Sequence, residues 1–221
     1  MSEATPADED EDEALSAGEG ANIGLPRMSK AELALFRDVL GRGYERYSEF
    51  GLGGSTLEAV RSGFKTLVAV DSDERWVQAV RRHPEMAAAR RSRRLSVLHA
   101  RIGPVGAWGK PSDPATIRTW TRYVGTAWAE WARRGEKPDL VFVDGRFRVA
   151  CALSALLACP DNPPLLMVHD MTEKRLRGYA AILRFWETVE QAESLRVLRA
   201  MPGRDNAALL TAFVESLLIH G

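Results

Sequence analysis

One stretch, residues 45–73, constrains the fold more than any other part of the chain. A short apolar segment runs into a glycine-rich turn, a helical segment follows, and a second apolar segment ends in an acid. The glycines remove side chains where a ligand approaches the backbone, and the helix N-terminus offers free N–H groups. This strand-turn-helix-strand unit predicts a nucleotide-type cofactor site. We expect its cofactor-binding residues to be Glu49, Gly51, Gly53, Gly54, Ser55, Thr56, Asp71 and Ser72.

The residues around the turn indicate which kind of cofactor binds. A dinucleotide site has glycine or alanine where this chain has Thr56. Glu49 precedes the first glycine by two residues, and a carboxylate there would repel a pyrophosphate but attract the amino group of a zwitterion. Asp71, at the end of the second strand, suits the hydroxyls of a ribose. The pattern therefore favours a zwitterionic nucleoside over a dinucleotide.

Three motifs in the correct order resemble those of class I S-adenosylmethionine-dependent methyltransferases. They are Glu49-Phe-Gly51-Leu-Gly53-Gly54-Ser55-Thr56, Val70-Asp71 and Asp139-Leu-Val-Phe-Val-Asp144-Gly145. The resemblance covers roughly residues 44–214 and implies S-adenosylmethionine as the cofactor. It departs at Arg101, because many relatives have an acid there that bonds the adenine amino group, and arginine cannot accept that bond. We expect Ile102 or Trp108 to cover the adenine instead.

The periodicity predicts an α/β fold with a doubly wound, mostly parallel seven-stranded sheet and helices on both faces. The resemblance implies strand order 3-2-1-4-5-7-6, with the last inserted strand antiparallel. The expected strands are 45–50, 66–70, 95–100, 140–143, 165–168, 195–200 and 207–214, the last two forming a hairpin around Pro202-Gly203. The expected helices are 29–40, 55–61, 72–82, 115–134, 149–158 and 173–190, and the Gly/Pro-rich residues 102–114 form a candidate functional loop.

Candidate catalytic residues follow the fourth and fifth strands, whose carboxyl ends lie beside the cofactor in this fold. Asp144 ends one strand, and His169 and Asp170 end the next. A histidine there can serve as a general base near neutral pH. The two aspartates could also share a divalent metal such as Mg, but the neighbouring Met171 is not a hard ligand, so a metal is not favoured.

Charge divides the chain into two parts. Residues 1–20 hold eight acids and no Lys or Arg, which leaves 22 acidic against 30 basic residues and a formal charge of +8 for the rest. We expect a disordered acidic tail over residues 1–26 and one Rossmann-like domain over 27–221. Without a long apolar run or a signal pattern, and with two cysteines that suit reducing conditions, the sequence predicts a cytoplasmic protein with no membrane partner.

The resemblance is closest to small-molecule and sugar O-methyltransferases, so a small-molecule or sugar-like acceptor methylated at oxygen is our primary hypothesis. A catalytically silent domain of the same fold is one alternative, which Arg101 and Met171 favour. A nucleic-acid methyltransferase is the other. It is favoured by the basic body and by an arginine cluster, namely Arg81, Arg82, Arg90, Arg91, Arg93 and Arg94.

Overall fold

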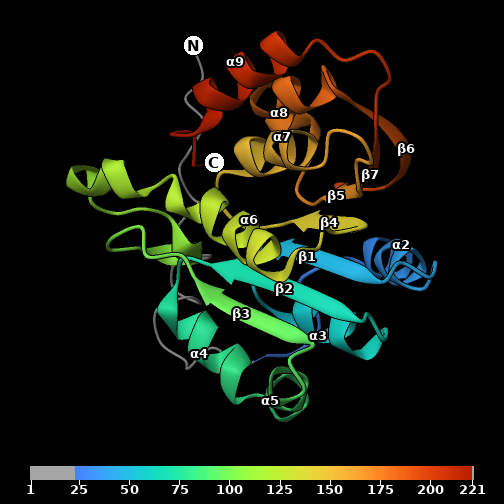
Figure 1. Cartoon of the computed structure of the whole chain (residues 1–221), viewed down its shortest axis with the longest axis vertical. Helices are drawn as coiled ribbons and strands as arrows, with labels where there is room; N and C mark the ends of the chain where they lie inside the picture. Colours follow the sequence, from blue (N-terminus) through green and yellow to red (C-terminus); the bar gives the residue numbers. More distant parts are fainter. Residues whose placement is uncertain (1–22, 221) are drawn as a thin grey trace, which may run out of the picture.

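The computed structural model describes residues 23–220, so most of the predicted acidic tail lies outside the described residues. Its centre is a seven-stranded sheet in the order β3-β2-β1-β4-β5-β7-β6, as predicted (Figure 1). The strands are β1 (Arg46–Phe50), β2 (Thr66–Asp71), β3 (Leu95–His99), β4 (Leu140–Val143), β5 (Leu165–Val168), β6 (Trp186–Ala192) and β7 (Leu195–Ala200).

Strand direction follows from the connections. The first five strands pair in parallel, because helical crossovers join them. β7 pairs antiparallel with both β5 and β6, since only Glu193 and Ser194 separate β6 from β7. The chain order reverses between β1 and β4, and this switch point is where open α/β sheets bind ligands.

Helices cover both faces of the sheet, because alternate strand residues point to opposite sides. One core packs β-strand residues against α2 (Lys30–Leu40), α3 (Gly54–Arg61), α4 (Glu74–Arg82) and α5 (Pro84–Arg91). The other packs them against α6 (Arg122–Arg134), α7 (Arg148–Ala158), α8 (Leu176–Leu183) and α9 (Asn206–Ser216). None of the helices between residues 23 and 220 has the length and apolarity that crossing a membrane requires.

Two element predictions near the C-terminus are wrong. The helix expected over 173–190 is a 3₁₀ turn, η3 (Glu173–Arg175), followed by α8 and then by β6, which begins at Trp186. The strand expected over 207–214 belongs to α9, whose N-cap Asp205 accepts hydrogen bonds from the backbone N–H groups of Ala207 and Ala208. The hairpin partner of β7 is therefore β6, and tertiary pairing overrides the helix-forming glutamates of that segment.

The Gly/Pro-rich loop after β3 is longer and more structured than predicted. It contains η1 (Ala107–Gly109) and a bridge between Val105 and Pro111, and it continues into η2 (Pro114–Thr119). The helix expected over 115–134 is thus split, and α6 begins at Arg122. An eight-residue helix, α5, was not predicted. Proline at its first position starts a new helix directly after α4.

Candidate functional site

The glycine turn between β1 and α3 is open on one side. A Cβ atom added at Gly53 would meet no atom within 4 Å, so space remains beside the turn. The Gly53 backbone N–H donates to the Thr56 hydroxyl at 3.1 Å, which holds the turn in shape. The other side is covered, because a Cβ at Gly54 would lie 2.5 Å from the backbone of residues 24–26. Part of the segment assigned to the tail by composition therefore packs on the turn.

Gly51 joins the two halves of the site. Its φ is +108°, and a Cβ there would lie 2.8 Å from the backbone nitrogen of Gly145. Gly145 is equally confined, because its Cβ would lie 1.9 Å from the Tyr123 hydroxyl. The ends of β1 and β4 thus approach backbone to backbone. This contact places the glycine turn directly beside Asp144.

Asp71 lies at the end of β2, half-buried under the loop that contains η1. Its carboxylate accepts hydrogen bonds from the backbone N–H groups of Leu52 at 2.9 Å and Asp73 at 2.8 Å. Burial raises the pKa of Asp71 to about 6 against these bonds. A carboxylate can accept about four hydrogen bonds, so Asp71 retains capacity to accept more. Ser72 is buried and donates to the Gly109 carbonyl at 2.9 Å, which ties the loop to β2.

Glu49 and the two hydroxyl residues lie beneath the turn. Glu49, Ser55 and Thr56 are buried, and the Ser55 hydroxyl donates to one Glu49 carboxylate oxygen. The other oxygen of Glu49 is buried and has no hydrogen-bond partner in the part of the chain that the structure describes. Burial raises the pKa of Glu49 to about 8 against hydrogen bonds from Ser55 and Thr56. Glu49 is therefore held next to the turn by the Ser55 hydroxyl, with one carboxylate oxygen still able to accept a hydrogen bond.

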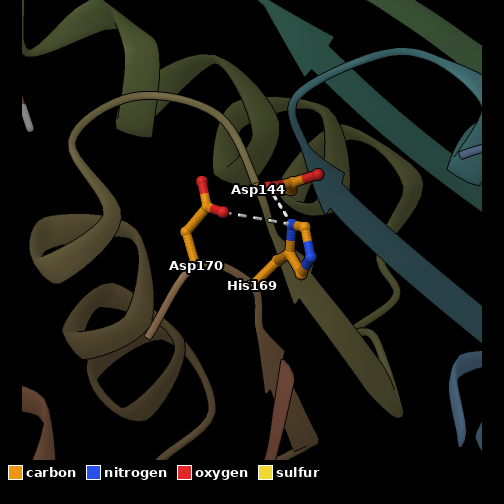
Figure 2. Close-up of side chains that lie close together, drawn as sticks. All are labelled: Asp144, His169 and Asp170. Atoms are coloured by element: carbon orange, nitrogen blue, oxygen red, sulfur yellow. Dashed lines mark hydrogen bonds and ion pairs between the residues drawn. The ribbon is translucent and has the colours of Figure 1, made fainter. Parts of the chain in front are cut away.

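The three predicted catalytic residues lie together (Figure 2). His169 Nδ1 is 3.0 Å from Asp144 Oδ1 and 3.7 Å from Asp170 Oδ1. The imidazole is buried, whereas about a third of each carboxylate side chain is exposed. Asp170 does not cap the following helical turn, whose N-cap is Thr172. The ends of β4 and β5 therefore present two accessible carboxylates held by one histidine.

Arg148, at the start of α7, neutralises this cluster. Its guanidinium donates to the backbone carbonyls of Gly145, His169 and Asp144 and lies 3.3 Å and 2.9 Å from the carboxylates of Asp144 and Asp170. Although burial raises the pKa of Asp170, the nearby Arg148 and His169 outweigh it and lower that pKa. Ligand atoms of Asp144, His169 and Asp170 lie within 4.8 Å of one another, as in a possible metal site, but the guanidinium already supplies a positive charge to both carboxylates.

Glu32, near the N-terminus of α2, completes the cluster. One carboxylate oxygen accepts from the Ser194 backbone N–H and hydroxyl at 3.0 and 2.6 Å. The other accepts from the Ser29 N–H at 2.9 Å and lies 3.4 Å from His169 Nε2. Burial opposes the charge on His169, but Asp144, Asp170 and Glu32 outweigh burial and raise the pKa of His169 to about 9. His169 is therefore an imidazolium at neutral pH and not a free base.

The free energy of unfolding should fall as pH rises from about 6.5 to 9, because His169 loses its proton over this range. The folded pKa of His169, about 9, lies above the ordinary value of 6.5, so the folded state holds the proton more tightly. The protonated His169 contributes up to about 3 kcal/mol to the free energy of unfolding below pH 6.5, and this contribution is lost as pH rises through 9. Urea unfolding at pH 6 and pH 9 measures this loss, which should be smaller in His169→Gln. A folded-state imidazole that titrates near 6.5 by NMR would contradict it.

Arg101, Ile102 and Trp108, the residues considered for the adenine, have different surroundings. Ile102 is fully buried in the core, and Arg101 is exposed on the surface. Trp108 is 38% exposed, and the guanidinium of Arg27 lies 4.5 Å from the centre of its ring. Of the three, only Trp108 lies in the part of the loop that covers Asp71 and has a partly exposed ring.

The sequence analysis missed Glu32 as a site residue. Glu32 forms a capping box with Ser29 at the start of α2, and this local pattern gives no sign of its contact with Ser194, 162 residues away.

The arginine cluster lies at the opposite end of the sheet, on and after α4 and α5 beside β3. Two of its members have structural roles. Arg81 donates to the Val97 carbonyl and Arg94 to the Val60 carbonyl, both at 2.9 Å. The cluster therefore lies at the other edge of the sheet from β5 and His169, and two of its members join helices to strands or to each other.

Known structures share this architecture. A methyltransferase-like protein from Silicibacter pomeroyi DSS-3 is 26% identical, with a TM-score of 0.71 over 90% of this chain and 99% of that one. An O-methyltransferase from Bacillus cereus, solved in complex with SAH, is 12% identical, with a TM-score of 0.53 over 86% of this chain and 90% of that one. No protein-family model and no curated protein matches the chain. The chain thus has the fold of the class I S-adenosylmethionine-dependent methyltransferases.

Proposed function

We propose that this protein transfers a methyl group from S-adenosylmethionine to an oxygen of a small-molecule or sugar-like acceptor in the cytoplasm. One observation carries the proposal: the contact between Gly51 and Gly145 places the open glycine turn beside the carboxylates of Asp144 and Asp170. A cofactor on the turn and an acceptor at the carboxylates would be neighbours. The two buried free cysteines are compatible with a reducing compartment.

The residues present fit the cofactor. Gly53 leaves space beside the turn, the Asp71 carboxylate can accept further hydrogen bonds from a ribose, and the partly exposed Trp108 ring could cover the adenine if Arg27 moves off it. When bound, S-adenosylmethionine supplies a methyl group already attached to a good leaving group. The protein then has to position the acceptor oxygen in line with that methyl group and remove its proton.

Proton removal falls to a carboxylate. His169 already holds its proton at neutral pH, so it cannot accept another. Asp144 and Asp170 are partly exposed, and either carboxylate can accept the hydrogen bond of an acceptor hydroxyl. His169, bonded to Asp144, orients that carboxylate and stabilises its charge. The scheme requires no metal, because Arg148 already supplies a positive charge to both aspartates.

The proposal predicts that SAH raises the melting temperature of the wild-type protein by roughly 5–10 °C at a hundred times its dissociation constant, since such a ligand stabilises by about 2.7 kcal/mol. Asp71→Asn should fold but lose at least tenfold in affinity, because an amide accepts fewer hydrogen bonds from ribose hydroxyls. Calorimetric titration with SAH measures both. Asp113→Asn is a suitable control, since Asp113 caps η2 on the same loop region, away from the ribose site. No saturable binding to the wild type would rule the proposal out.

A catalytically silent domain is the second candidate. The packing of residues 24–26 on Gly54 and of Arg27 on Trp108 favours it, because both contacts cover parts of the cofactor site. The same SAH titration separates the two. A silent domain that binds nothing gives no shift, whereas an enzyme binds SAH with this segment displaced or closed over it.

A further inference from the structure

A cavity of about 990 Å³ lies beside the acid-histidine cluster. Its walls come from the N-terminus of α2, the end of β5, the start of α8 and the turn between β6 and β7. The lining residues include Arg27, Glu32, His169, Asp170, Glu193 and Arg196. This volume suits a small molecule. Because Asp170 and His169 form part of the wall, a ligand here would touch the end of β5 where the proposed function places the acceptor.

The two inner carboxylates of the cavity already have partners. Glu32 accepts three hydrogen bonds from protein groups and lies beside His169. Asp170 pairs with Arg148 at 2.9 Å and with Arg175 at 3.1 Å. The other acids, Glu173 and Glu193, are exposed at the rim. Their charges are therefore balanced or hydrated, and they create no demand for a cationic ligand.

Arg196, on β7, differs from these carboxylates because its charge is not balanced by a neighbouring group among the described residues. Its side chain is partly buried, and its Nε atom is buried without a hydrogen-bond partner among residues 23–220. Its one hydrogen bond to a described residue is a long one, 3.4 Å from Nη1 to the Thr188 hydroxyl. Within residues 23–220 no carboxylate lies within 4.0 Å of its guanidinium. Buried guanidinium N–H groups that lack acceptors are costly, so a ligand that supplies them is favoured.

Arg27 adds a second cation to the same cavity. Its guanidinium rests on the Trp108 ring and likewise has no carboxylate partner among residues 23–220. Two unpaired guanidinium groups on one small-molecule cavity are suited to a carboxylate or phosphate, which a guanidinium binds through paired hydrogen bonds.

We propose that this cavity is the acceptor site and that Arg196, assisted by Arg27, binds an anionic group on the acceptor. The acceptor is then a small hydroxylated carboxylate or phosphate ester, anchored at Arg196 with its hydroxyl at Asp170. This inference rests on the proposed function for the identity of the reacting group. It does not extend to nucleic acid, because the arginine cluster lies on α4 and α5 at the other edge of the sheet.

Arg196→Gln and Arg199→Gln make a matched pair for the test. Both arginines lie on β7, but Arg199 is three residues further along, so it faces the other side of the sheet and pairs with Glu187 in solvent. The probes are benzoate and inorganic phosphate, each titrated by NMR into the protein with and without SAH. We expect saturable binding of at least one anion to the wild type. We expect a loss of about tenfold in Arg196→Gln, a partial loss in Arg196→Lys, and no change in Arg199→Gln.

The outcomes separate this inference from the proposed function. SAH binding without anion binding, or an equal loss in both glutamine variants, would overturn the inference and leave the methyltransferase proposal standing. Anion binding that depends on Arg196 in a protein that does not bind SAH would support the anion site and defeat the proposed function. A single-stranded oligonucleotide that binds through Arg196 where benzoate and phosphate do not would also overturn the inference. The melting temperature of each variant verifies that it is folded.

Discussion

Replacing Arg148 by methionine should lower the free energy of unfolding by about 3–5 kcal/mol, the range for removing one partner of a buried ion pair. Methionine fills similar space but leaves Asp144 and Asp170 without their shared countercharge and three backbone carbonyls without a donor. For a domain of this size the melting temperature should fall by roughly 10 °C. Urea unfolding at pH 7, followed by circular dichroism, measures the change.

Arg175→Met is the matched control for this experiment. Arg175 also pairs with Asp170, at 3.1 Å, but its side chain is 59% exposed. Exposed pairs contribute about 0–1 kcal/mol because water and salt already screen them. We therefore expect a small change in this variant. A loss below about 1 kcal/mol in Arg148→Met would show that the aspartates are stabilised without the guanidinium, and it would reopen the space between them to a metal.

Gly51→Ala and Gly53→Ala should affect different properties although the glycines are only two residues apart: the first should lower stability and the second should weaken SAH binding. At Gly51 the backbone is left-handed and a Cβ would press on the Gly145 backbone, so alanine should cost about 2–5 kcal/mol of folding free energy. At Gly53 the backbone is extended and the space is open, so alanine should cost less than about 1 kcal/mol. It should instead weaken SAH binding at least tenfold, because its methyl group enters the space that we assign to the cofactor. Thermal unfolding and SAH calorimetry measure the two effects separately.

Equal stability of the two variants would contradict the close approach of β1 and β4. Normal SAH affinity in a folded Gly53→Ala protein would place the cofactor elsewhere. Gly63→Ala serves as a reference for left-handed strain alone, since Gly63 has φ +87° but a Cβ there would meet nothing within 4 Å. The difference between Gly51→Ala and Gly63→Ala then measures the steric contribution of the Gly145 backbone.

Local chemistry made most of the sheet predictable. β1 to β5 are apolar segments bounded by glycine, charge or proline, and they lie within one residue of the predicted limits. The C-terminal errors have two different causes. α9 carries its own signal, because Asp205 caps an alanine- and leucine-rich segment, and the turn at Pro202-Gly203 was misread as a hairpin. β6 carries no such signal, because glutamate and glutamine favour helix and only pairing with β7 makes the segment a strand.

The sequence by itself determined the glycine turn, the acids at the ends of β2 and β4, and the meeting of Asp144, His169 and Asp170. Strand ends in a parallel sheet share one edge, so spacing along the chain is enough to bring those residues together. Only the tertiary structure decided the charges of these groups. The proton on His169 is held mainly by Asp144 and Asp170 and also by Glu32 from α2, Arg148 supplies a positive charge to both aspartates, and the cavity is completed by Arg196 from β7. Those contacts join segments far apart in the chain, and electrostatic and packing interactions act through space and leave no local pattern in the sequence.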